Sequence, residues 1–83
     1  MIQIVYEKCF MPYEFDTIDE AFQHIFGRCL WNGILQEHSL VRIQRETEHL
    51  ELRCPVVRDY IHVYADSDIL DKLEVMLVAN FLY

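Results

Sequence analysis

The chain of 83 residues is poor in the residues that loosen a backbone, with two glycines and two prolines. Linkers and disordered segments are rich in both, so we expect residues 1–83 to fold as one small domain. Long apolar runs are also missing, because none reaches the ~20 residues that a membrane-spanning helix needs. The first residues lack the basic start and cleavable apolar segment of a signal peptide. The protein is therefore predicted to be cytoplasmic, with no membrane partner.

Cysteine is scarce and odd in number, with Cys9, Cys29 and Cys54 as its only occurrences. A small secreted domain held by disulfides usually carries an even and denser set of cysteines. We therefore predict three reduced thiols, buried as small apolar side chains. This prediction agrees with a cytoplasmic location.

Zinc ligands at motif spacing are missing as well. Zinc motifs place two cysteines or two histidines a few residues apart, and neither kind of pair occurs here. A site built across strands from His49, Cys54 and His62 stays open, although strand alternation puts His49 and Cys54 on opposite faces. We expect no bound metal and no other cofactor.

Basic residues are outnumbered two to one, since 7 Lys and Arg against 14 Asp and Glu give a net charge of −7. This charge repels a phosphate backbone and attracts a basic protein surface. One hypothesis is therefore an acidic inhibitor or decoy that binds a basic surface of a nucleic-acid enzyme. Six acids have a simpler explanation, because they lie where two predicted helices begin and complement the helix dipole. These are Asp16, Asp19, Glu20, Asp66, Asp68 and Asp71.

The first helix is the best-defined element of the sequence. Thr17 and Glu20 have the spacing of a capping box, and Gly33 is placed to end the helix. Apolar residues recur at helical spacing between them: Ile18, Ala21, Phe22, Ile25, Phe26, Cys29 and Leu30. Gly27 interrupts this helix, and we interpret it as a point where another element approaches the backbone closely.

Period-two alternation predicts the strands. Ile2–Glu7 forms the first strand, and a loop with Pro12 follows from Cys9 to Asp16. After Ser39, three further strands each carry one apolar face, and residues 46–48 connect the first two of them. Pro55 must end or bulge the second of the three because it cannot donate to the ladder. The inward residues are Val41, Ile43, Leu50, Leu52, Cys54, Ile61 and Val63.

The last helix begins at Asp66 or Ser67, and its core stripe contains Ile69, Leu70, Leu73, Met76 and Leu77. The predicted fold class is α+β, in β-α-β-β-β-α order, with two helices packed on one face of an antiparallel sheet. An alternative is that residues 75–83 form a short final strand, since short apolar runs are ambiguous. In the helical arrangement five apolar residues lie off the stripe: Val75, Val78, Phe81, Leu82 and Tyr83.

Two surfaces follow as candidates for binding a protein. One is the apolar excess of the last helix, which a second copy would cover. The other is the sheet face opposite the helices, which is rich in the residue types found at interface hot spots. Alternation places Arg42, Gln44, His49, Glu51, Arg53, Arg58, Tyr60, His62 and Tyr64 on that face. The candidate partner-binding residues are Arg42, Arg53, Tyr60, His62, Tyr64, Val75, Val78, Phe81, Leu82 and Tyr83.

No catalytic residue is predicted. The chain has no Gly-rich phosphate loop and no Gly-x-Ser-x-Gly motif, and a Cys54–His62 pair fails the alternation test. The leading hypothesis is a non-enzymatic protein–protein interaction module, homodimeric through its last helix. The alternatives are the acidic decoy, a single-strand nucleic-acid binder that stacks bases on Tyr60, His62 and Tyr64, and an ordinary solvated sheet face with no partner.

Overall fold

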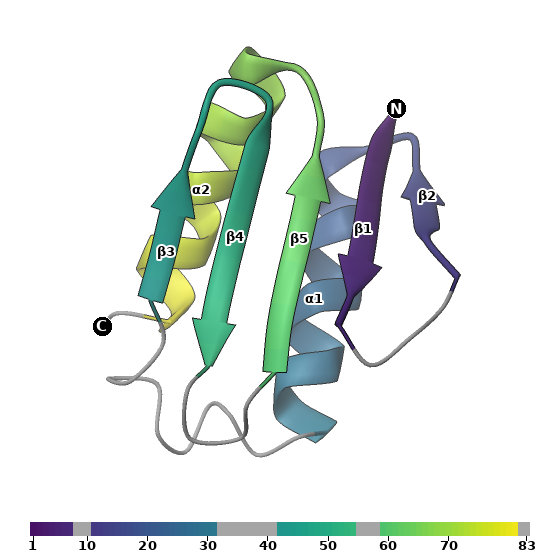
Figure 1. The fold of residues 1–83 in the computed structure, drawn as a ribbon, viewed down its shortest axis with the longest axis vertical. Helices are drawn as coiled ribbons and strands as arrows, with labels where there is room; N and C mark the ends of the chain where they lie inside the picture. The colour runs from purple at the N-terminus through teal and green to yellow at the C-terminus, as the bar shows by residue number, and fades with distance from the viewer. Residues whose placement is uncertain (8–10, 32–41, 55–58, 82–83) are drawn as a thin grey trace.

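The computed structural model describes residues 1–7, 11–31, 42–54 and 59–81, which form one sheet with two helices behind it (Figure 1). The elements are β1 (Ile2–Tyr6), β2 (Tyr13–Phe15), α1 (Ile18–Trp31), β3 (Arg42–Arg45), β4 (His49–Cys54), β5 (Asp59–Tyr64) and α2 (Ser67–Phe81). The described strands lie in the order β2-β1-β5-β4-β3, and every neighbouring pair is antiparallel. The predicted α+β class and the order of the predicted elements are confirmed.

The strand β2 corrects the prediction of a loop from Cys9 to Asp16. Tyr13 and Phe15 pair with Ile4 and Ile2 of β1, so β2 extends the sheet beyond the first strand. Three residues are too short to show a period-two pattern, and Pro12 before them indicated a turn. The strand forms because β1 offers an edge to pair with and the His24 ring of α1 packs against the rings of both residues.

Both helices begin as their capping residues dictate. Thr17 Oγ1 accepts a hydrogen bond from the Glu20 amide at 3.2 Å and donates one to Glu20 Oε1 at 2.9 Å. The Ala21 amide donates to the Thr17 carbonyl, and the Leu70 amide donates to the Asp66 carbonyl. A cap residue accepts this first helical bond, so Thr17 caps α1 and Asp66 caps α2.

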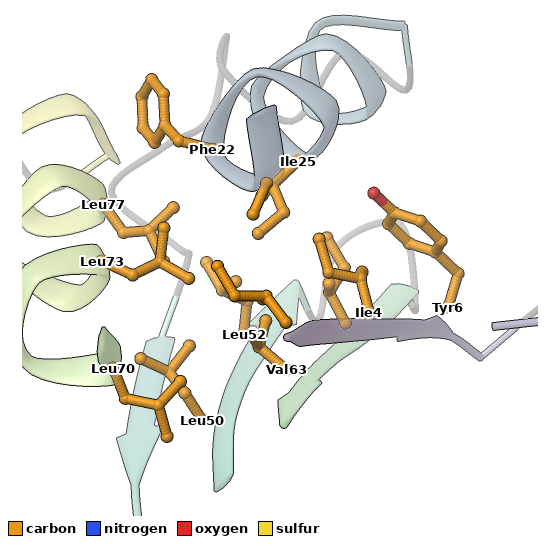
Figure 2. Packing of buried hydrophobic residues seen from close by; sticks show 13 residues of the cluster. Ile4, Tyr6, Phe22, Ile25, Leu50, Leu52, Val63, Leu70, Leu73 and Leu77 are labelled. Carbon is orange, nitrogen blue, oxygen red and sulfur yellow. The ribbon is translucent and has the colours of Figure 1, made fainter. Parts of the chain in front are cut away.

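The core lies between the sheet and the helices, where inward side chains from both layers interlock (Figure 2). Burying one such side chain stabilises the fold by about 1.5–3 kcal/mol. The buried set is Ile2, Ile4, Tyr6, Ala21, Phe22, Ile25, Leu50, Leu52, Ile61, Val63, Leu70, Leu73 and Leu77. Those of α1, β4, β5 and α2 are the inward positions that alternation and helical spacing predict, whereas Ile2, Ile4 and Tyr6 add the inner side of β1.

The helix α2 runs unbroken from Ser67 to Phe81, so a final strand over residues 75–83 is excluded for its described part. Leu70, Leu73 and Leu77 face the sheet, whereas Val75 is 69% exposed. The helix therefore buries one stripe and turns a second, narrower apolar strip away from the sheet. Neither described helix has the length and apolar character needed to cross a bilayer.

Several predicted features lie outside the described residues. These are Cys9, the α1 stop at Gly33, the inward-facing Val41, the strand end at Pro55, and the candidate residues Arg58, Leu82 and Tyr83. The side chains of Cys29, Leu30, Cys54 and Phe81 are also outside the described part of the structure.

Gly27 does not serve a close approach, contrary to the interpretation of the sequence. A Cβ built on Gly27 has no atom of another element within 4 Å, and the residue is exposed on α1. The helix therefore carries the entropic cost of an internal glycine without a packing advantage in the described structure.

We predict that Gly27→Ala stabilises the protein by about 1 kcal/mol, because alanine restricts the unfolded chain and fits the helix without contact. Urea denaturation followed by circular dichroism measures the change. Ala21→Gly, the reverse substitution in the same helix, is the control and should destabilise the fold. A loss of stability in Gly27→Ala would show that this position meets a neighbour after all.

Arg45 joins the edge strand β3 to α2. It lies two residues after Ile43, on the helix-facing side of the sheet, and only 18% of its side chain is exposed. Its guanidinium donates to Asp71 Oδ1 at 2.7 Å, Glu74 Oε1 at 3.4 Å and the Ser67 carbonyl at 2.9 Å. The hydrogen bond to Asp71 raises the pKa of Arg45 above its usual value. The planar, multi-donor head of arginine is what lets one side chain hold three partners.

We predict that Arg45→Met lowers the denaturation midpoint, because it leaves Asp71 and Glu74 close together without their cation. Arg45→Lys should lose less, since it keeps the charge but not the fork of donors. Arg42, exposed on the same strand, supplies the matched control, and Arg42→Met should not lower the midpoint, because it removes a like charge opposite Arg53. Equal effects at positions 42 and 45 would contradict the role given to Arg45.

Candidate functional site

The face of the sheet turned away from the helices, called the open face here, is covered by no described element (Figure 1). Alternate residues of the strands point to it, as period two predicts. Register places them in rows across the sheet, with Arg42 beside Arg53, Gln44 beside Glu51, and His49 beside Tyr64. The described members are Gln3, Val5, Glu7, Glu14, Arg42, Gln44, His49, Glu51, Arg53, Tyr60, His62 and Tyr64.

Three rings form an ordered row on the open face. His49 stacks on Tyr64 with centroids 4.8 Å apart and planes 14° apart. His49 also lies beside His62, with centroids 5.4 Å apart and only 3.2 Å between His49 Nε2 and His62 Nδ1. These distances place the two imidazoles edge to edge, joined by a hydrogen bond. The rings are therefore fixed relative to one another before any partner arrives.

Carboxylates flank both ends of the histidine pair. Glu7 Oε2 lies 3.2 Å from His62 Nε2, and Glu46 Oε2 lies 3.8 Å from His49 Nδ1. In the tautomer of His62 that carries Nε2–H, this group donates to Glu7, and His62 Nδ1 accepts a hydrogen bond from His49 Nε2–H. The two rings and Glu7 then form one hydrogen-bonded chain across the open face.

A second interaction orders the neighbouring strand. Arg53 Nε donates to Glu51 Oε2 at 2.9 Å, while Glu51 Oε1 lies 3.9 Å from His62 Nδ1. Glu51 thus links the arginine to the histidines, and its side chain is mostly buried among them. The candidate residues Arg53 and His62 are brought into one network through this glutamate.

The candidate residues of α2 lie on the opposite side of the molecule. Val75 is exposed and Val78 is half-buried. They line a shallow hollow of about 530 Å³ together with Asp71, Glu74 and Ala79. The structure therefore separates the predicted site residues into two surfaces, and it brings together only those on the sheet.

Sequence reasoning missed five participants in the open face: Gln3, Val5, Glu7, Glu14 and Glu46. The first three share a parity within the first strand, opposite to Ile2, Ile4 and Tyr6, and this signal could have placed them on the face. Glu46 lies in the β3–β4 turn, where the Glu46 amide donates to the His49 carbonyl. Its role follows from a turn geometry that the local sequence does not specify.

A second cluster of rings lies on the helix side of the sheet, around His24 of α1. Tyr6 Oη lies 2.6 Å from His24 Nδ1, and the His24 ring packs against Tyr13 and Phe15 at 4.5 and 5.0 Å between centroids. The Arg28 guanidinium lies 4.3 Å above the Tyr6 ring. Burial, and then the charge of Arg28, lower the pKa of His24 below 6.5. When His24 is neutral and its Nδ1 carries no proton, Nδ1 accepts a hydrogen bond from the Tyr6 hydroxyl. This cluster therefore ties β1 and β2 to α1.

The described residues contain no group of three or more His, Cys, Asp or Glu side chains arranged to hold a metal ion. No protein-family model, curated protein or solved structure matches the chain. The function must therefore be argued from the two surfaces themselves.

The lowered pKa of His24 predicts a loss of stability in mild acid. A group whose pKa is lower in the folded state contributes stability above its unfolded pKa, near 6.5, and loses it as the pH falls through the folded value. In the wild type, the unfolding free energy measured by urea titration should therefore be lower in mild acid than at neutral pH. His24→Asn, which keeps an acceptor for Tyr6 but cannot be protonated, should fall less steeply. An unchanged slope in this variant would contradict the assignment.

Proposed function

We propose that the protein is a non-enzymatic protein-interaction module that binds a protein partner through the open face. The observation that supports it most directly is the fixed row of His62, His49 and Tyr64 on a sheet face that no described element covers. Ordered aromatic rings provide contact area without further loss of side-chain freedom, which is the main cost of forming an interface. The cytoplasm is the location proposed for it, on the basis of its cysteine content.

The composition of the face supports docking more than simple solvation. Tyrosine and arginine are enriched at hot spots, and this face contains Tyr60, Tyr64, Arg42 and Arg53. An ordinary solvated face gains little from holding such side chains in a network. The hydrogen bonds from His62 to Glu7 and from Arg53 to Glu51 keep the face in one arrangement.

The α2 strip is the weaker candidate. Its apolar part consists of Val75, Val78 and Ala79, with Asp71 and Glu74 beside them. This strip is narrow in its described part, because Leu70, Leu73 and Leu77 already face the core. Homodimerisation through α2 remains a separate prediction, and a substitution at Val75 distinguishes it from docking on the sheet.

A non-enzymatic role fits the openness of the face. Acid–base and nucleophilic catalysis act in pockets that exclude water and hold a substrate. His49 and His62 instead lie on a sheet surface, where their ring nitrogens bond to each other and to carboxylates. We therefore place these side chains in a binding surface and not in an active site.

The proposal predicts that substitutions on the open face abolish partner binding and that those on α2 do not. Tagged wild-type protein, His49→Ala/Tyr64→Ala and Val75→Glu would be purified gently from the native cells. Each co-purifying protein, the untagged chain included, would then be purified and titrated by calorimetry. We expect the double variant to weaken binding by roughly tenfold or more, because hot-spot truncations cost at least this much.

Val75→Glu serves as the control, since it alters an exposed residue on the other side of the molecule. Unchanged affinity in His49→Ala/Tyr64→Ala, with a folded circular dichroism spectrum, would refute the proposal. Loss of binding in Val75→Glu alone would move the interface to α2. Binding of single-stranded oligonucleotides to wild type, lost in the double variant, would identify a nucleic-acid surface and also refute it.

A further inference from the structure

The open face carries opposite charges at its two ends. Arg42 and Arg53 lie directly across from each other where β3 begins and β4 ends. At the other end of the same strands, Glu46 and Glu48 lie in the β3–β4 turn, and Asp66 follows β5. His49 and Tyr64 border the acidic end. Along β3 and β4 the face is thus polarised in the strand direction, from basic to acidic, while Glu7 lies beside Tyr60 and His62 at the basic end of the β1 side.

We propose that a second copy of this chain docks on the open face, related by a two-fold axis that crosses the strands near Glu51 and His62. This inference rests on the proposed function and names its partner. Such an axis exchanges the two ends of the face, so the basic end of each copy meets the acidic end of the other. One polarised surface then supplies both halves of two equivalent charge contacts.

The acidic end has a hollow whose lining suits an arginine side chain. A hollow of about 530 Å³ lies there, lined by Glu46, Glu48, His49, Tyr64 and Asp66, with Met1, Thr47 and Ala65 beside them. Tyr64 is 42% exposed and lines this hollow. A guanidinium pairs with carboxylates and also packs against aromatic rings, so the hollow contains both kinds of group that arginine binds.

At the basic end, two arginines lie side by side, and only one of them has a carboxylate partner within the described part of the chain. Like charges placed directly across two strands destabilise a sheet, and Arg42 faces Arg53 in this way. Glu51 partners Arg53, whereas Arg42 has no ion-pair partner within the described part of the chain. Carboxylates brought by the acidic end of a second copy would neutralise this end. The arrangement therefore explains why two arginines occupy a pair of positions that disfavours the isolated sheet.

A charge-reversal exchange tests the arrangement. Sedimentation equilibrium would be measured for wild type, Arg42→Glu/Arg53→Glu, Glu46→Arg/Glu48→Arg, and an equimolar mixture of the two variants. Wild type should reach twice the 10.0 kDa chain mass. The dissociation constant of each variant dimer should be roughly tenfold higher than that of wild type, or more, because like charges then meet at both contacts. The mixture should form the dimer again, since reversed ends meet complementary ends.

Asp19→Arg/Asp68→Arg is the matched control, because it changes the net charge as Glu46→Arg/Glu48→Arg does but on the helix layer. It should dimerise like wild type. If circular dichroism shows that a double variant does not fold, the single variants Arg42→Glu and Glu48→Arg replace it, since both positions are exposed. Each should again weaken the dimer alone and restore it in the mixture.

Three results would overturn the inference. A wild type that stays at 10.0 kDa at all concentrations excludes self-pairing, while a foreign partner lost in His49→Ala/Tyr64→Ala would still support the proposed function. A dimer that resists both charge reversals and dissociates in Val75→Glu belongs to α2. Variants that dissociate alone and do not pair when mixed exclude the two-fold arrangement.

Discussion

The structure depends on one apolar interface, between the inner face of the sheet and two helices. A domain of this size buries only roughly 60% of its unfolded surface, so a second core is out of reach. Alternation in each strand sends every other residue to this interface, and a slip of one residue would exchange the two faces. Leu50 and Leu52 lie inward because His49, Glu51 and Arg53 lie outward. The core and the open face are therefore set by the same register.

This coupling explains how much the sequence predicts. The class, the two helices, the strands of the alternating regions and the sides of the sheet all follow from periodicity, because periodicity is the physical cause of the layering. Arg42, Arg53, Tyr60, His62 and Tyr64 reach the predicted face for this reason. The hydrogen bonds of His62 to His49 and Glu7 depend on register between strands, which no local window of sequence contains.

The failures have physical causes of the same kind. The strand β2 forms only because β1 and the ring of His24 are already in place, so its three residues carry no signal of their own. Arg45 has the parity of a core residue, and its burial is explained only by Asp71 and Glu74, 26 and 29 residues away in sequence. Gly27 was overinterpreted, since an internal glycine has a packing role only when a neighbour comes close.

Arg45 and Arg42 of the edge strand β3 have different surroundings. The two side chains point to opposite faces of β3, three residues apart. Arg45 meets carboxylates of its own chain and holds α2 to the sheet. Arg42 meets a second arginine and gains nothing from the fold in its described surroundings. A side chain that costs the monomer stability is explained by what it does outside the monomer. In the proposed self-docking, the excess of positive charge at this end and of negative charge at the other is the surface by which one copy would recognise another.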